Sequence, residues 1–367
     1  MAEAQRAAGG APAAIDAKVR KFPCGQCGAD VVWNPGVSAL RCPYCGAEKA
    51  VPTTARELRE HPIEEALREP KDLGWGAERK AIRCNRCGAV TTLEPAVAAS
   101  RCAFCGTPAV VEAPLDGKMV RPEGLLPFRV DRTGAVAKFR SWISGLWFRP
   151  NDLGNKAAVT GMSGVYIPFW TFDAATHSLW TADAGTFYYV DVEAVENGQS
   201  VIRQEQRVRW EPAEGFLEKF FDDLPVAASK GLERSLAEAI EPFPTSELVG
   251  YDPSYLSGFL AEEYAVGVED ALAIAKRRMQ AEIEAACSAQ VPGDTQRNLQ
   301  VQTTTSGLTY RNALLPVWIA AYDYSGTPYR FLVNGVTGKV SGKAPWSWLK
   351  IGLALLAAAV LLYLTTR

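Results

Sequence analysis

The 367 residues carry 39 Lys and Arg against 41 Asp and Glu, and the resulting formal charge of −2 is unlike the positive charge of a dedicated nucleic-acid binder. The chain starts MAEAQRAAGGAPAAIDAKVRK, which lacks the apolar segment of a secretory signal peptide and so disfavours a secreted protein. Residues 1–17 are rich in Ala and Gly, and we expect them to be disordered.

Eight of the nine cysteines follow as two copies of one unit, and each copy has two C-x-x-C pairs separated by 14 residues. These cysteines are Cys24, Cys27, Cys42 and Cys45, then Cys84, Cys87, Cys102 and Cys105. Four thiolates on two short knuckles are the ligand set of a closed, tetrahedral Zn²⁺ site. A glycine after each second cysteine suits a turn with positive φ. Two disulfide-stapled modules are the alternative, which the lack of a signal peptide disfavours.

The spacing therefore predicts two four-cysteine zinc ribbons, at residues 18–52 and 79–115, with two structural Zn²⁺ per chain. A charged segment at residues 53–78 is predicted to be a helical linker between them. Around the first ribbon, five Lys and Arg stand against two Asp and Glu. This small excess leaves both protein and nucleic acid open as partners, and we favour protein.

Residues 120–345 form a region large enough for a hydrophobic core of its own, with the signals of an α+β domain built on antiparallel sheet. Helices are predicted by apolar residues at helical spacing, and strands by alternation and by turn residues. The predicted helices are 138–148, 227–241 and 255–289; the predicted strands are 165–174, 178–195 and 200–215, followed by a meander that ends near 342. Asn197 and Gly198 are placed at a hairpin tip.

Few side chains in this region suggest catalysis. His177 lies near Asp173 and Asp183 in the sequence and is the one candidate for a small metal or acid–base cluster, although an isolated surface histidine is the simpler interpretation. The pair Asp222–Asp223 is better explained by a turn or a helix cap than by acid–base work. Cys287 has no partner histidine on its helix, and we expect a buried thiol.

The C-terminal segment, residues 348–366, is predicted to be a transmembrane helix. It contains 14 uncharged residues, Ile351 to Leu364, with tryptophans and lysines before them and Tyr363 and Arg367 at the end. A buried helix of a soluble domain is the alternative, but such a helix rarely lacks a polar face. Lys339, Lys343 and Lys350 outnumber Arg367, so the bulk of the chain is expected on the cytoplasmic side.

The chain also resembles a known family. The resemblance rests on the two predicted ribbons, the predicted C-terminal span and the segments GVYIPFWTFDA, RVRWEPAEG, FFDDLPV, EPFPTSELVGY, VPGDTQRNLQV and LLPVWIAAYDY…RFLVNGVTGKVSG. These are similar to bacterial membrane-anchored proteins with TFIIB-type zinc ribbons, which are often labelled primosomal protein N′ (replication factor Y), a superfamily II helicase. The resemblance implies a membrane-tethered zinc-binding module in the bacterial inner membrane.

A helicase motor itself is not expected. Two RecA-like domains of about 150 residues each would exceed the region that is left between the ribbons and the span. The segment nearest to a phosphate-binding loop, GVTGKVSGKA, lacks the required spacing and lies in a predicted meander. The sequence therefore predicts a scaffold or adaptor that acts through protein contacts and is not an enzyme, with a replication-linked nucleic-acid-binding factor as the alternative.

Overall fold

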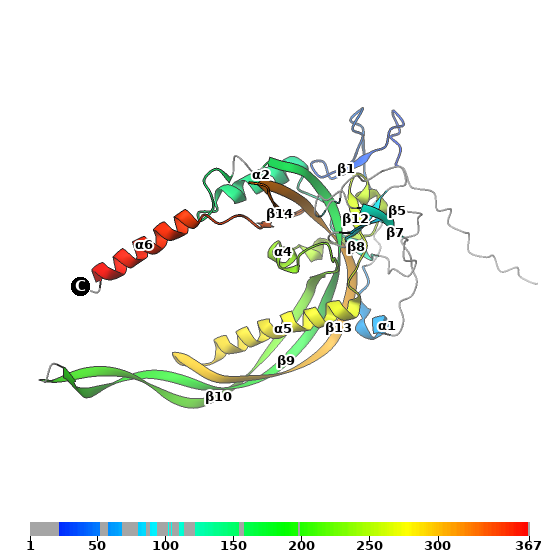
Figure 1. The fold of residues 1–367 in the computed structure, drawn as a ribbon. Coiled ribbons are helices and arrows are strands. Elements are labelled where there is room, and N and C mark those ends of the chain that lie inside the picture. Colours follow the sequence, from blue (N-terminus) through cyan, green and yellow to red (C-terminus); the bar gives the residue numbers. More distant parts are fainter. Residues whose placement is uncertain are drawn as a thin grey trace, which may run out of the picture.

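Three strands of unusual length form the centre of the fold: β9 (Ala158–Glu196), β10 (Gln199–Ala227) and β13 (Thr295–Tyr324). The computed structural model describes residues 22–51, 58–67, 80–85, 89–93, 102, 104, 110–113, 122–153, 158–196 and 199–365. β9 lies in the middle and pairs antiparallel with β10 on one side and with β13 on the other. Figure 1 shows that the three strands curve together into an arch.

The strands bend where the ladders carry extra residues. Register shifts occur between Phe221 and Leu224 in β10 and at three places in the β13 ladder, Arg297–Gln300, Ser306–Thr309 and Ala320–Tyr322. All but the last contain a residue with positive φ, namely Asp223, Asn298 and Gly307. A bulge increases the local twist and bends its strand, which accounts for the arch. The predicted strands 165–174 and 178–195 are one strand, because the residues between them stay paired with both neighbours.

Shorter strands extend this sheet on both sides of β9 and β13. The sheet has 12 strands in all, with the main order β11-β8-β13-β9-β12-β6-β5-β7, while β10 pairs with β9, β14 with β13 and β15, and β4 with β13. Their bounds are β4 His61–Pro62, β5 Lys80–Cys84, β6 Val90–Leu93, β7 Val110–Ala113, β8 Gly124–Leu125, β11 Val249–Gly250, β12 Leu260–Glu262, β14 Thr327–Asn334 and β15 Val340–Gly342. A separate sheet contains β1 (Val32–Asn34), β2 (Ala39–Arg41) and β3 (Glu48–Lys49).

The helices are α1 Ile63–Leu67, α2 Arg132–Ser144, α4 Arg234–Ala239, α5 Val268–Gln290 and α6 Trp348–Thr365, with short 3₁₀ turns η1 Thr245–Glu247 and η2 Pro253–Leu256. Helices α4 and α5 are shorter than the sequence predicted, whereas α2 starts and ends before the predicted helix 138–148 does. The predicted helix 255–289 starts only at Val268, because η2 and β12 occupy its first part. Gly258 lies between them against Val32 of the separate sheet, and its φ of +86 is incompatible with a continuous right-handed helix.

Some predictions fall on residues outside the described part of the chain. The predicted linker helix is represented by α1, and residues 52–57 and 68–79 lie outside that part. The same holds for the N-terminal residues 1–17 and for Asn197 and Gly198 at the predicted hairpin tip. The hairpin itself is present, because Glu196 of β9 pairs with Gln199 of β10.

Three hydrophobic clusters fill the fold. α5 covers the concave side of the arch with a buried stripe at helical spacing, namely Leu272, Ala275, Met279, Ile283 and Cys287. The cluster around Phe128 and Phe139 includes residues of the separate sheet, and a third cluster includes Cys84 and Cys102. Both cysteine-rich segments therefore belong to the core of the molecule. The prediction of an α+β fold is confirmed. The three long strands pair antiparallel, as predicted, but the sheet is mixed, because β12 pairs parallel with β9 and β8 pairs parallel with β13.

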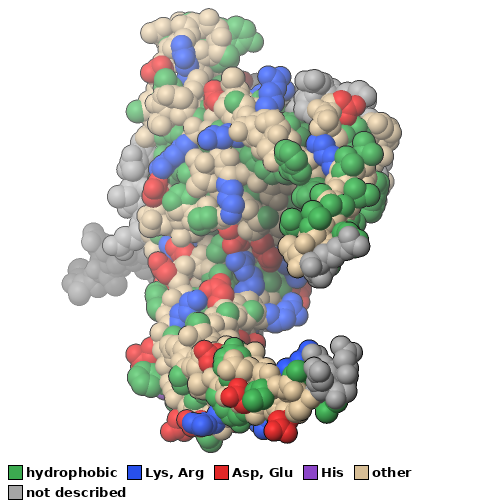
Figure 2. All heavy atoms as spheres, turned by 90° about the vertical axis from the view of Figure 1, so that its left-hand side faces the viewer, with side chains coloured by type: hydrophobic (Ala, Val, Ile, Leu, Met, Phe, Trp, Pro, Cys, Tyr) green, Lys and Arg blue, Asp and Glu red, His purple; other side chains and the backbone are tan. Residues whose placement is uncertain are grey.

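The C-terminal helix α6 stands apart from these clusters. It is 18 residues long, none of its residues is buried, and its length and composition fit a membrane crossing. In Figure 1 it leaves one end of the arch and projects toward the same side as the tip of the β9–β10 hairpin. Figure 2, which looks at that side, shows hydrophobic side chains gathered on α6, whereas charged side chains are scattered over the rest of the face.

Candidate metal centre

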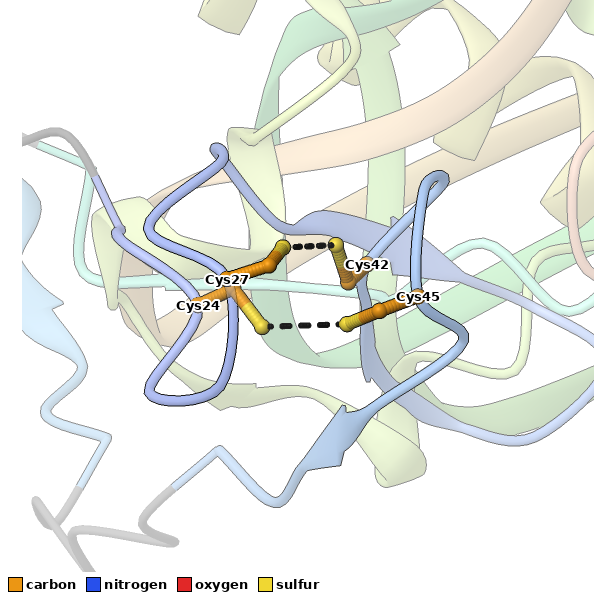
Figure 3. Close-up of side chains that lie close together, drawn as sticks. All are labelled: Cys24, Cys27, Cys42 and Cys45. Carbon is orange, nitrogen blue, oxygen red and sulfur yellow. Dashed lines mark hydrogen bonds between the residues drawn. The ribbon is translucent and has the colours of Figure 1, made fainter.

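The four cysteines of the first predicted ribbon come together in the structure. Cys24 and Cys27 precede β1, and Cys42 and Cys45 lie between β2 and β3. Their four sulfur atoms lie within 4.8 Å of one another, with Sγ–Sγ distances of 3.5 Å for Cys24–Cys45 and 3.4 Å for Cys27–Cys42 (Figure 3). This group can hold a metal ion, and among the described residues no other group of His, Cys, Asp or Glu gathers so closely.

Both knuckles have the same backbone turn. The amide of Cys24 donates to the carbonyl of Ala29 and that of Gly28 to Cys24, at 2.7 and 2.9 Å. The second knuckle repeats these bonds from Cys42 to Ala47 and from Gly46 to Cys42, at 2.8 and 3.0 Å. Gly28 and Gly46 both have φ +75, the left-handed conformation predicted for the glycine after each second cysteine. The turns aim the sulfur atoms at a common centre.

Backbone amides also favour the thiolate form that a metal requires. The amide of Cys45 has the largest effect on Cys42 and, against the effect of burial and with help from the amide of Tyr44, lowers the pKa of that thiol to about 6. The amides of Cys27 and Gln26 likewise lower the pKa of Cys24. The amide of Ala47 also lowers the pKa of Cys45. Hydrogen bonding to the Cys24 sulfur and burial outweigh this effect and raise the pKa of Cys45 to about 12. A bound cation would displace the protons retained in this group.

Buried contacts hold the first four-cysteine segment against the rest of the described chain. Trp33 of β1 donates its indole N–H to the carbonyl oxygen of Phe128 at 3.0 Å, and its ring lies 4.8 Å from that of Tyr255. Ser257 makes two hydrogen bonds to the same segment. Its carbonyl oxygen accepts from the amide of Trp33 at 3.0 Å, and its side-chain hydroxyl donates to the carbonyl oxygen of Val31 at 2.7 Å. Cys24 and Cys42 face this packed side and are buried, whereas Cys27 and Cys45 remain exposed.

The second copy is described only in part. Cys84 and Cys102 are buried, while Cys87 and Cys105 lie outside the described residues. The amide of Cys84 donates to the carbonyl of Ala89 at 2.9 Å, the same turn that Cys24 and Ala29 form 60 residues earlier. Strands β5 and β6 of this copy join the large sheet, because β6 pairs with β12. The turn supports the sequence repeat, and the ligation of a second ion remains a prediction.

The equivalent aromatic residues of the two copies differ in their surroundings. Tyr44, in the second knuckle of the first copy, is 83% exposed, whereas Phe104 in the second copy is 1% exposed. Phe104 packs where Gly231 leaves space, since a Cβ at Gly231 would lie 2.9 Å from its ring. The repeat therefore gives similar turns but presents only the first aromatic side chain to solvent.

The predicted cluster of His177, Asp173 and Asp183 does not form, because each residue has other partners. His177 contacts Glu218 at 3.5 Å and stacks on Phe216, and Asp183 binds Arg297 and Asn298. Asp173 instead accepts from the amide of Asp223. Asp223 sits in the β10 bulge with positive φ, so Asp222–Asp223 interrupts the strand register and is neither the turn nor the helix cap that the sequence predicted. Cys287 is buried as predicted, and burial raises its pKa.

Two buried polar groups were missed by the sequence analysis. Arg311 forms ion pairs with Asp223 and Glu60, and this carboxylate group includes Asp173. Glu262 is fully buried beside the second copy, accepts a hydrogen bond from Ser229 at 2.8 Å, and has a pKa raised to about 8 by burial. Local sequence carries no signal for either group, because their members come from segments far apart in the chain.

Comparison with known proteins adds one relative. No protein-family model matches the chain, and no solved structure matches it. The chain is similar to "Uncharacterized protein YdjG" of Bacillus subtilis (strain 168), with 28% identity over 331 residues. The alignment covers 89% of this chain and 90% of YdjG, so the likeness extends over most of both proteins.

Proposed function

We propose that this protein is a membrane-tethered scaffold whose two zinc ribbons are fixed parts of one cytoplasmic domain and contact a protein partner. It acts by binding and carries out no catalytic step or ATP-driven motion of its own. Each ribbon holds one structural Zn²⁺, the first through Cys24, Cys27, Cys42 and Cys45 and the second through Cys84, Cys87, Cys102 and Cys105. The resemblance to the bacterial membrane-anchored zinc-ribbon family agrees with this assignment.

The geometry of the first site supports zinc. Zn–S bonds of about 2.3 Å in a tetrahedron place the sulfurs about 3.8 Å apart. The sulfur atoms here lie 3.4 Å apart at the nearest and within 4.8 Å throughout, so the ion would need only small side-chain adjustments. Four cysteine ligands leave no open coordination position for water or substrate, so the ion would stabilise the fold and not perform chemistry.

The properties of α6 support the membrane anchor. Its 18 residues span about 27 Å at 1.5 Å per residue, close to the ~30 Å hydrocarbon core of a bilayer. None of its side chains packs against the rest of the described chain closely enough to be buried. The lysines at 339, 343 and 350 favour a cytoplasmic location for the domain, and we propose the bacterial inner membrane as its site.

The observation that carries the scaffold proposal is the way the ribbons are built into the fold. The first is held by Trp33, and strands of the second join the large sheet. A ribbon that grips nucleic acid needs cations, and residues 18–52 contain five Lys and Arg against two Asp and Glu. Arg41 forms an ion pair with Glu48, with an N–O distance of 4.0 Å. This small excess of positive charge does not by itself call for a phosphate backbone, and a protein contact is the function we favour.

One observation favours the alternative, a nucleic-acid-binding factor. Tyr44 is the kind of exposed aromatic side chain on which an unpaired base stacks. Because Tyr44 stands at the tip of a knuckle, either class of partner would meet it first.

A photo-crosslinking experiment at Tyr44 separates the two functions. The full chain would carry p-benzoylphenylalanine at position 44, or at the exposed Phe216 as a matched control, and would be irradiated in native membranes. The scaffold predicts a protease-sensitive adduct at position 44 that is absent at 216. A nuclease-sensitive adduct would favour the alternative, and the absence of any adduct at 44 would contradict a partner contact at this knuckle.

A further inference from the structure

The segment that follows α2 meets the start of α6 although about 200 residues separate them. The carbonyl oxygen of Trp147 accepts from the Lys350 ammonium at 2.9 Å, and that of Phe148 accepts from the amide of Ser347 at 2.9 Å. Trp147 is 76% exposed, so the contact is made by its backbone while its ring faces solvent. The position of this segment is therefore fixed by the first turn of α6.

Cations and aromatic rings alternate across this junction. The Arg149 guanidinium lies 3.7 Å from the centre of the Trp346 ring and donates to the carbonyl of Ala344 at 2.6 Å. The Lys350 ammonium lies 5.8 Å from the centre of the Trp147 ring. Each segment thus supplies one ring and one cation to the other. This exchange ties the two segments to the same level of the molecule.

The exposed tryptophans of the protein gather here. Trp147, Trp346 and Trp348 are 76, 56 and 78% exposed, and the other tryptophans that the structure describes are buried or half-buried. Exposed indole rings next to snorkelling lysine and arginine are typical of the headgroup region of a bilayer, because the ring has an apolar body and a polar N–H.

We propose that residues 145–150 form a second membrane contact, in which Trp147 and Phe148 insert into the headgroup region of the bilayer that α6 spans. The inference rests on the proposed membrane anchor, since it is α6 that brings the bilayer surface to the level of Trp348 and Lys350. Trp147 is bound to Lys350 and must lie at that level too. The partner of this surface is lipid, and a protein ligand is an outcome that the test below distinguishes.

The contact would orient the whole domain on the membrane. α2, which ends directly before the segment, packs on the sheet through Phe139, whose ring stacks on that of Phe331 at 3.7 Å. Figure 1 shows α2, β14 and α6 together at one end of the arch. With α6 alone the domain would have a single point of attachment to the bilayer. A second contact at 145–150 restricts rotation about that point and holds the ribbons at a defined place relative to the bilayer.

The test is photo-crosslinking to lipid in phospholipid vesicles that contain the full chain. p-Benzoylphenylalanine would replace Trp147 in one variant, Leu356 in the middle of α6 in a second, and the exposed Phe216 of the sheet in a third. Lipid adducts would be counted on the corresponding peptides by mass spectrometry. We expect adducts at 147 and 356 and only background signal at 216. Replacement of Phe148 gives an independent probe of the same segment, and unchanged metal content verifies that each variant is folded.

The outcomes separate the two proposals. Adducts at 356 with background at both 147 and 148 would overturn the second contact and leave the anchor standing. Background at 356 would overturn the anchor, and with it the inference. Equal yields at 147 and 216 would show that the contact is not specific to this segment, and a protein adduct at 147 in native membranes without a lipid adduct would assign the surface to a protein partner.

Discussion

Replacement of Trp33 by Ala is the sharpest test of whether the first ribbon is a fixed part of the domain. The side chain is buried, donates to the carbonyl of Phe128 and packs on Tyr255. Truncation of a buried Trp to Ala costs about 3–5 kcal/mol. Trp33→Phe keeps an aromatic ring but loses the hydrogen bond, and a buried carbonyl left without it costs about 1–3 kcal/mol.

The lost free energy should weaken the packing of the first ribbon against the domain and leave metal binding unchanged. The knuckle turns at Cys24 and Cys42 are held by bonds within the ribbon, so the Trp33→Ala ribbon should keep its zinc. A docking loss of about 3 kcal/mol raises the population of the undocked ribbon by about two orders of magnitude. We expect Trp33→Phe to give a smaller increase in the same direction.

Hydrogen exchange of the zinc-loaded full chain in detergent measures this change. Amides in β1 and around Ser257 should exchange faster in Trp33→Ala, and metal analysis should show the same zinc content as before. Tyr44→Ala is the matched control, because that ring is exposed and makes no comparable packing contact. Equal protection of Trp33→Ala and Tyr44→Ala, or loss of zinc together with docking, would refute the reasoning.

Three further predictions follow from the site and the fold. Metal analysis of the full chain should give two zinc ions, and Cys42→Ser should lower this number by one. Deletion of residues 346–367 should release the protein from carbonate-washed membranes into the soluble fraction. Burial, and then the hydrogen bond with Glu60, raise the pKa of Asp173 in the folded protein to about 6. The folded state therefore favours the neutral carboxyl, and this contribution to stability is complete below the pKa of about 3.9 in the unfolded chain and is lost as pH rises through about 6. Asp173→Asn should therefore stabilise the protein by about 1–2 kcal/mol at pH 8, allowing for solvent screening, and have little effect at pH 4, as thermal unfolding would show.

Local patterns in the sequence predicted the local parts of the structure. The C-x-x-C spacing led to the group of four sulfurs in the first copy, and the glycine after each pair led to the turns at Gly28 and Gly46. The apolar stripe of α5 and the uncharged C-terminal helix were also visible, because helical periodicity involves residues only a few positions apart. These features depend on neighbours along the chain, which is why sequence was sufficient.

Features that depend on distant neighbours were not predicted. Nothing near Trp33 in the sequence indicates that its indole binds the carbonyl of Phe128, 95 residues away. β9 was divided in two because short strands are the usual expectation, whereas here β10 and β13 pair with it along most of its length. The buried Glu262 likewise depends on Ser229 from another part of the chain.

The two copies show how surroundings can separate similar sequences. Tyr44 and Phe104 occupy the same place in the repeat, each directly before the last cysteine of its copy. The space left by Gly231 receives Phe104, so the second ring is used to pack the ribbon into the domain. No such packing buries Tyr44, which stays 83% exposed. If a partner is bound through a knuckle tip, the first copy is therefore the one that offers it an aromatic side chain, while the second copy serves the fold.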